Sequence, residues 1–227
     1  MSGTFFRNVF RYYERRQQLS GLLAHALQCE LTAAEAIYWS YSQRERTTWA
    51  ELIRARRAFG DDPARGTEPD LITLTPEVLV WIEAKLGGPN RTVPSNPGRR
   101  DGYLTGGNGW FDQVCRGDHE TIAITEKLYE LLRMWLLGSW LAQQMGRRFV
   151  LVNLVPEARE KDIEARLARH LVSEPRRRFL RWTWEAIYRH TRERCKAEPD
   201  RERLLDYFHG KTLGYDREGR LQKVFSV

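Results

Sequence analysis

The sequence predicts a single α/β domain in which a central mixed β-sheet is flanked by α-helices. Three observations support this fold class. Residues 4–27 show the apolar periodicity of an amphipathic helix, residues 71–85 are rich in β-branched and large apolar residues, and a strongly apolar helix pattern precedes a buried strand at 149–155. The length of 227 residues suits one domain spanning 1–227, and no break in composition divides it.

Residues 1–60 are expected to be mainly helical. Apolar residues recur at steps of three and four between residues 4 and 27, which is the spacing of one helix face. Residues 33–58 are expected to add one or two further helices. The string Gly-Asp-Asp-Pro at 60–63 then indicates a loop.

Residues 69–86 are expected to form a β-hairpin. Segments 71–75 and 78–85 read as antiparallel strands separated by Pro76 and Glu77. Proline fixes φ near about −65°, which excludes the mirror-image turns of two-residue hairpins, so a four-residue loop around a type I turn is expected. The alternative is a helix start, with Thr75 as N-cap and Pro76 at the first helical position.

The expected hairpin register brings two acids together. When Ile72 pairs with Trp81, Asp70 lies opposite Glu83. Their Cβ atoms are then about 5 Å apart on one face, where like charges destabilise the pairing unless something offsets the repulsion. A slip of one residue would instead place Asp70 opposite Ala84.

The rest of the chain completes the domain. Glycine and proline strings interrupt residues 87–109 without a usable period, so 87–118 is expected to be a long loop. The completing region, 125–227, alternates helical and strand-like patterns. Its expected elements are a helix at 125–145, a strand at 149–155, a helix at 157–170, a long helix from Pro175 to near Cys195, a short helix from Pro199 and a small hairpin at 211–227.

The charge balance favours a polyanionic partner. The formal net charge is +7, and only six of the 37 basic residues are lysines. Arginine forks suit phosphate oxygens better than lysine does, although solvated helix faces are the alternative for any single cluster. The clusters are Arg7, Arg11, Arg15 and Arg16; Arg54, Arg56 and Arg57; Arg99 and Arg100; and Arg176, Arg177, Arg178 and Arg181.

Composition also bears on location. The longest nearly uncharged apolar stretch, Met134–Ala142, is far shorter than the roughly 20 residues of a membrane-spanning helix, and no signal-peptide pattern opens the chain. The cysteines are odd in number and widely separated, which fits neither a disulfide framework nor a structural zinc cluster. We therefore expect a cytoplasmic protein with no membrane association.

Asp70, Glu83 and Lys85 carry the expected chemistry. Two facing carboxylates offer hard oxygen ligands, and Mg²⁺ is held in this way while phosphate and water fill its other positions. The side-chain period of two places Lys85 on the same face as Glu83. An ammonium group there can orient or deprotonate a metal-bound water.

The pair Pro69-Asp70, followed after twelve residues by Glu83-Ala84-Lys85, resembles the signature of the PD-(D/E)XK nuclease superfamily, whose fold is restriction-endonuclease-like. The superfamily places these acids on a β-hairpin after an N-terminal helix, and this chain supplies both in that order. The helix and strand at 128–155 resemble the rest of the common core, so the resemblance spans most of the chain.

This resemblance implies a Mg²⁺-dependent DNA endonuclease, with Mn²⁺ as a substitute ion, acting in restriction, phage defence or repair. By resemblance, Asp70, Glu83 and the Ala84 carbonyl bind the metal and Lys85 positions the attacking water. Glu14 resembles the first-helix glutamate that holds a second ion or a metal-bound water. Double-strand cutting would favour a homodimer, since two strands need two sites.

Alternatives remain for this assignment. Gln113 is not followed by the tyrosine of the RecB-like branch, which argues against that branch. Asp70 and Glu83 can also be read as a loop acid and a strand acid paired with Lys85, and Glu14 as a surface ion-pair partner. The rival functions are a non-catalytic nucleic-acid-binding protein with the same fold, and an RNA nuclease.

Overall fold

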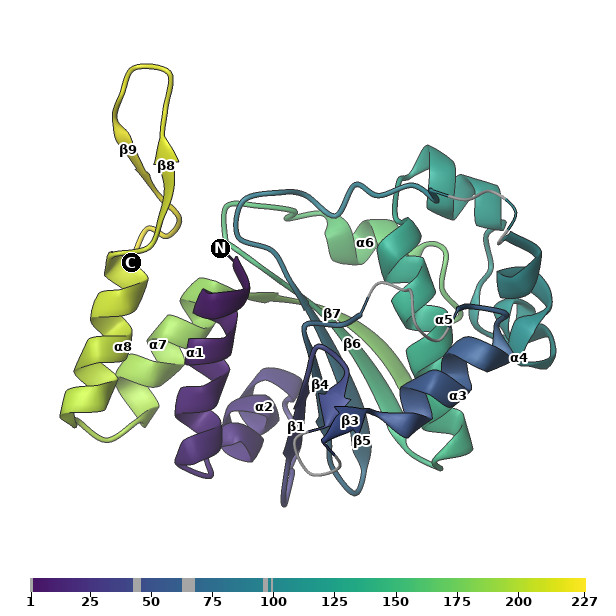
Figure 1. Cartoon of the computed structure of the whole chain (residues 1–227), viewed down its shortest axis with the longest axis horizontal. Coiled ribbons are helices and arrows are strands. Elements are labelled where there is room, and N and C mark those ends of the chain that lie inside the picture. Colours follow the sequence, from purple (N-terminus) through teal and green to yellow (C-terminus); the bar gives the residue numbers. More distant parts are fainter. Residues whose placement is uncertain (1, 43–45, 63–67, 96–97, 99) are drawn as a thin grey trace.

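The computed structural model describes residues 2–42, 46–62, 68–95, 98 and 100–227 (Figure 1). A seven-stranded mixed sheet forms its centre, in the order β3-β2-β1-β4-β5-β6-β7. Neighbours from β3 to β5 are antiparallel, whereas β6 runs parallel to both β5 and β7. The strands are β1 (Glu35–Tyr38), β2 (Tyr41–Ser42), β3 (Thr47–Thr48), β4 (Leu71–Leu74), β5 (Val78–Ala84), β6 (Arg148–Val155) and β7 (Arg177–Thr183).

Helices cover both faces of the sheet (Figure 1), so the expected α/β class with a mixed central sheet is confirmed. On one face lie α1 (Ser2–Arg15), α2 (Leu19–Leu27), α7 (Trp184–Arg194) and α8 (Pro199–His209). On the other lie α3 (Ala50–Ala58), α4 (Arg100–Val114), the π-helix η2 (Thr121–Thr125), α5 (Tyr129–Gln144) and α6 (Ile163–Ala168). A hairpin of β8 (Thr212–Tyr215) and β9 (Leu221–Lys223) follows α8. None of the described helices is long and apolar enough to cross a membrane.

Strand β5 is buried along its whole length and separates two cores. Val80 and Ile82 pack on the side of α1, whereas Leu79 and Trp81 pack on the side of α5. Because side chains alternate along a strand, Glu83 falls on the α5 side. The same alternation that builds two apolar cores therefore points one acid toward the first turn of α5.

The β4–β5 hairpin has the expected register. Ile72 pairs with Trp81, and the ladder ends where Leu71 pairs with Ile82. Thr75 closes the loop, since its amide donates to the Val78 carbonyl at 3.0 Å and its hydroxyl accepts from the Val78 amide at 2.8 Å. The alternative of a helix starting at Thr75 is wrong.

Residues 33–58 differ from the expected helices. They form β1, β2 and β3 before α3 begins at Ala50. Four-residue and two-residue strands carry too little alternation to be distinguished from a helix pattern, and β1 is fixed by its non-local pairing with β4. The expected helix at 4–27 is also two helices, because Gln17 adopts a left-handed φ of 55° between α1 and α2.

Three later elements also differ from expectation. Strand β7 occupies the first part of the segment expected to be a helix from Pro175, and the longer second part, α7, is helical as expected. Helix α4 lies within the expected loop 87–118, of which residues 96, 97 and 99 are outside the described part. Helix α6 is shorter than 157–170. The sequence does not reveal β7, because this strand pairs in parallel with β6, from which a helical connection separates it.

The close approach of α5 to the sheet positions the site. A Cβ on Gly138 would lie 2.4 Å from ring carbons of Phe149 in β6, so only glycine fits at this crossing. Helix α5 then connects directly into β6, which runs back parallel to β5. Its first turn, with Glu130, consequently lies beside the carboxyl end of β5.

Candidate active site

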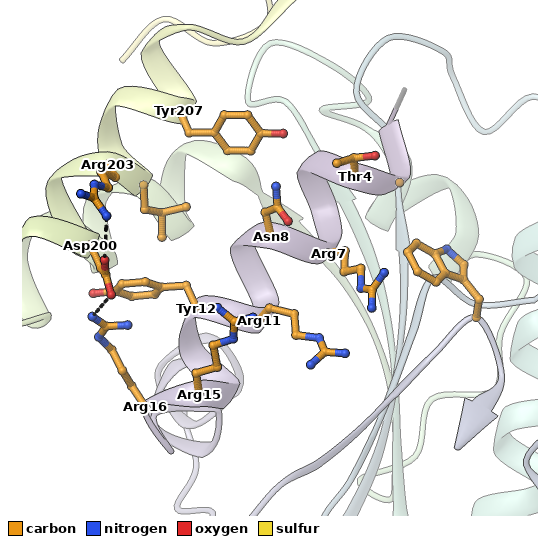
Figure 2. Close-up of a pocket in the computed structure, with 13 residues that line it drawn as sticks. Thr4, Arg7, Asn8, Arg11, Tyr12, Arg15, Arg16, Asp200, Arg203 and Tyr207 are labelled. Carbon is orange, nitrogen blue, oxygen red and sulfur yellow. Dashed lines mark hydrogen bonds and ion pairs between the residues drawn. The ribbon is translucent and has the colours of Figure 1, made fainter. Parts of the chain in front are cut away.

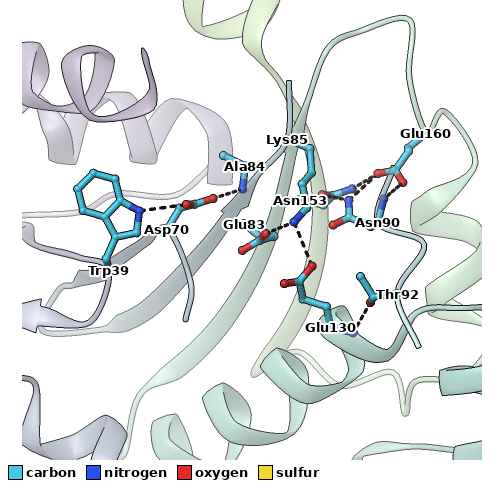
Figure 3. Close-up of polar contacts among 10 residues, drawn as sticks. All are labelled: Trp39, Asp70, Glu83, Ala84, Lys85, Asn90, Thr92, Glu130, Asn153 and Glu160. Carbon is cyan, nitrogen blue, oxygen red and sulfur yellow. Dashed lines mark hydrogen bonds and ion pairs between the residues drawn. The ribbon is translucent and has the colours of Figure 1, made fainter. Parts of the chain in front are cut away.

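The carboxyl end of β5 brings together Asp70, Glu83 and Lys85, three of the residues predicted from the sequence (Figure 3). Lys85 Nζ donates to Glu83 Oε1 at 2.5 Å and to Glu130 Oε2 at 3.0 Å. The side chain of Glu83 is 5% exposed and that of Lys85 is 25% exposed. The ammonium group therefore links a buried strand carboxyl to one on the first turn of α5, while part of the Lys85 side chain is exposed to solvent.

Asp70 lies one residue beyond the β4 ladder, at the edge of the same cluster. Its Oδ2 accepts a hydrogen bond from the Ala84 amide at 2.9 Å, and its Oδ1 accepts one from the Trp39 indole at 3.2 Å. The carboxylate thus accepts the strand amide as a backbone carbonyl would, and both of its oxygens are held by hydrogen bonds. The described contact of Ala84 is through its amide, whereas the sequence hypothesis assigned its carbonyl to the metal.

Glu83 is the most perturbed acid of the cluster. Burial raises its pKa to about 8, an effect that the attraction of Lys85 only partly offsets and that the charges of Asp70 and Glu130 reinforce. Burial also raises the pKa of Asp70. Glu83 Oε2 is buried without a hydrogen-bond partner among the described residues. A buried oxygen in that state is costly, and a proton or a cation would satisfy it.

Lys85 is held as a cation. Burial by itself would lower its pKa, but the charges of Glu83 and Glu130 raise the pKa above its ordinary value. A lysine with a raised pKa carries its proton at neutral pH and is a poor base. Of the two roles considered from the sequence, the structure therefore favours orienting a water over deprotonating it.

A second polar network lies beside Glu83 on β6 (Figure 3). Asn153 is in register with Glu83 on the neighbouring parallel strand. Its side chain donates to Glu160 at 2.8 Å and accepts from Asn90 at 2.7 Å. Neither these residues nor Glu130 can be recognised from the sequence, because isolated asparagines and an acid at a helix start are common for structural reasons.

Glu14 lies apart from this cluster. It accepts a hydrogen bond from the Tyr38 hydroxyl at 3.2 Å and forms an ion pair with Arg11 at 3.7 Å. Tyr38 belongs to the core on the α1 side of the sheet, opposite the side on which Glu83 lies. No contact among the described residues joins Glu14 to Asp70, Glu83 or Lys85.

The donor set fits a divalent ion held by few protein ligands. Asp70 and Glu83 supply carboxylate oxygens, and one of these oxygens is buried and unsatisfied. In the described part of the chain, no group of three or more His, Cys, Asp or Glu side chains is arranged around a metal position. Mg²⁺ characteristically uses one or two carboxylates and completes its shell with water and phosphate, so Asp70 and Glu83 would hold it.

The buried proton of Glu83 predicts a pH-dependent stability. A carboxyl whose folded pKa is raised stabilises the fold most below its unfolded pKa, and this contribution is lost as the pH rises through the folded pKa. Relative to Glu83→Gln, the wild type should lose about 4 kcal/mol of stability between about pH 4.5 and about pH 8. Urea unfolding of both proteins across this range measures the difference. Parallel stability curves would contradict the assignment of the proton to Glu83.

Comparisons of this chain with protein-family models, with curated proteins and with solved structures found no match.

Proposed function

We propose that this protein is a Mg²⁺-dependent nuclease that hydrolyses phosphodiester bonds of DNA. One observation carries the proposal: the β4–β5 hairpin ends in two carboxyl groups, one with an unsatisfied buried oxygen, beside an ammonium group. Perturbed carboxyl groups that cluster with a lysine at a strand end are typical of sites that handle a metal and a phosphate.

The order of elements supports a restriction-endonuclease-like core. Helix α1 precedes three antiparallel strands, β1, β4 and β5, and helix α5 then leads to β6, parallel to β5. The carboxylates lie at the end of the hairpin formed by the second and third of these strands. This is the arrangement that the resemblance of Pro69-Asp70 and Glu83-Ala84-Lys85 implies.

Each residue has a distinct role in the proposed reaction. Asp70 and Glu83 hold Mg²⁺, or Mn²⁺ in its place, which when bound neutralises phosphoryl oxygens and lowers the pKa of a coordinated water. Lys85 donates to the attacking water and fixes its direction toward phosphorus. Glu130 keeps the Lys85 ammonium in place through the 3.0 Å contact. Trp39 and the Ala84 amide fix the Asp70 carboxylate.

A second candidate is a nucleic-acid-binding protein that keeps the fold without the chemistry. The Lys85 ammonium lies within hydrogen-bond distance of both Glu83 and Glu130, so part of the negative charge is compensated without any ion. This reading predicts salt-sensitive binding of DNA with no cleavage, and binding that Glu83→Ala leaves unchanged.

Incubation with plasmid and linear DNA tests the nuclease proposal. Wild type should cleave with Mg²⁺ and leave DNA intact in EDTA. Asp70→Asn should lose at least 100-fold in rate, since it removes a charged metal ligand at constant shape. Asp162→Asn is the matched control, because that aspartate is 70% exposed and lies on the loop before α6. Intact DNA in every condition would remove the enzyme assignment.

A further inference from the structure

A groove lies between α1 and α8, on the side of the sheet opposite the Glu83 cluster (Figure 2). Its volume is about 850 Å³. Five arginines and one aspartate provide its charged lining, so the groove is strongly positive. These residues are Arg7, Arg11, Arg15, Arg16, Arg203 and Asp200.

Three of the arginines form a regular row on α1. Arg7, Arg11 and Arg15 recur at every fourth residue, which places them on one face of the helix about 6 Å apart. Arg7 and Arg15 are exposed and form no ion pair or side-chain hydrogen bond among the described residues. Arg11 forms a 3.7 Å ion pair with Glu14, and its guanidinium lies over the Tyr38 ring, 5.7 Å from the ring centroid. A row of available guanidinium groups at this spacing suits successive phosphates of one strand.

Several arginines of the sequence clusters are held by contacts within the protein. Arg56 is 1% exposed and pairs with Glu68. The guanidinium of Arg181 donates to the backbone carbonyl of Arg159 at 2.7 Å. Within the α1 cluster itself, Arg16 is held by Asp200 at 2.9 Å. Arg99 lies outside the described residues. Exposed arginines also lie elsewhere, such as Arg176 and Arg178, but the α1 row is the one that lines this groove.

Trp39 connects the groove to the candidate active site. Its indole lines the groove, is 36% exposed and donates to Asp70. The guanidinium of Arg7 lies over the ring, 6.0 Å from its centroid. The groove lining does not include Asp70, Glu83 or Lys85, so Trp39 is the shared residue of the two sites.

The backbone at Trp39 is strained. Trp39 and Ser40 are the central residues of the β1–β2 turn, since Tyr38 pairs with Tyr41, and their φ angles are 47° and 60°. This is a type I′ turn, in which asparagine and glycine are preferred. A bulky residue there costs on the order of 1 kcal/mol or more, a cost that persists mainly at functional positions. This strained turn holds the Trp39 indole in an exposed position.

We propose that the groove binds a single nucleic-acid strand, with phosphates on Arg7, Arg11 and Arg15 and an unpaired base stacked on Trp39. The direction of the strand toward Asp70 rests on the proposed nuclease function. A single row of charges ending at an exposed aromatic ring matches the way proteins hold single strands. A duplex, an acidic protein or an anionic membrane offers no unpaired base to the ring.

Fluorescence anisotropy with a labelled thymidine oligonucleotide in EDTA tests the groove without any cleavage. Arg7→Gln/Arg15→Gln should weaken binding on the order of tenfold and reduce the slope of log K against log salt by about 1.4. Arg189→Gln/Arg192→Gln is the matched control, because both arginines are exposed on α7 outside the groove. Equal losses in the two double variants, or equally tight binding of a blunt duplex, would overturn the proposal.

Two substitutions of Trp39 separate stacking from the contact with Asp70. Trp39→Asn should weaken oligonucleotide binding roughly tenfold, while thermal stability stays equal or rises because the turn is relaxed. Trp39→Phe should keep binding within about threefold and lower cleavage, since it keeps a ring but loses the donor to Asp70. Unchanged affinity in Trp39→Asn would overturn the stacking role.

The groove and the nuclease can fail separately. If the wild type cuts no DNA but binds the oligonucleotide, and the α1 variants bind it more weakly, the groove proposal is supported and the nuclease proposal is excluded. The opposite outcome is that the wild type cleaves DNA and the α1 variants match it in both cleavage rate and oligonucleotide affinity. That result would support the nuclease proposal and exclude the groove as a binding site.

Discussion

Replacing Lys85 with methionine is expected to lower Mg²⁺-dependent DNA cleavage by at least 100-fold. Methionine keeps most of the side-chain volume and removes the only ammonium group that contacts Glu83 and Glu130 among the described residues. Because this group orients the attacking water in the proposed reaction, its loss should appear mainly in kcat. Single-turnover cleavage at saturating DNA measures the effect.

The stability of Lys85→Met adds a readout that does not depend on activity. Without the ammonium group the carboxyl groups repel one another, so the variant should be less stable than wild type by about 1–3 kcal/mol at pH 8 and by less at pH 5. Lys161→Met is the matched control, because Lys161 is exposed. Full cleavage by a folded Lys85→Met protein would exclude a role for Lys85 in the reaction.

Replacing Arg133 with methionine is expected to destabilise the protein by about 3–5 kcal/mol. Arg133 on α5 forms an ion pair with Asp61 at 2.6 Å and donates to the Tyr103 hydroxyl at 2.8 Å, and the side chains of Arg133 and Asp61 are 3% and 1% exposed. The substitution removes the guanidinium charge while Asp61 stays buried. Urea unfolding at pH 7 measures the loss.

A double variant distinguishes loss of the charge from loss of packing. Arg133→Met/Asp61→Leu removes both charges and should recover more than half of the stability lost in Arg133→Met. Helix α5 also carries Glu130, which holds the Lys85 ammonium. Arg133→Met should therefore also reduce cleavage, because a less firmly packed α5 would position Glu130 and Lys85 less well. Equal stabilities of the single and double variants would show that the ion pair is not the source of the effect.

The hairpin was predictable because its determinants are local. Pro76 limited the turn types and the apolar segments on either side fixed the register, so the pairing of Ile72 with Trp81 followed from sequence alone. The same register placed Asp70 and Glu83 at one end of the hairpin. Lys85 then followed from the period of two along β5.

The other parts of the site depend on distant pairing. Strands β1 and β7 depend on long-range ladders with β4 and β6, and their own sequences carry little alternation. Glu130 reaches Lys85 because α5 crosses the sheet closely at Gly138. Glu14 sits on the opposite side because β1 and Tyr38 lie between α1 and the cluster. Spacing in the sequence reports none of these tertiary contacts.

Isothermal titration of Mg²⁺ and of Mn²⁺ into the protein near pH 7 is the most direct test of the carboxylate pair as a cation site. Because Glu83 has a pKa raised to about 8, an ion that binds it must displace its proton. Repeating the titration in buffers of different ionisation enthalpy should therefore reveal release of nearly one proton per bound ion, and Glu83→Gln should abolish both the release and most of the affinity. An ion that binds wild type and Glu83→Gln equally, or a wild type that binds none, would contradict the account.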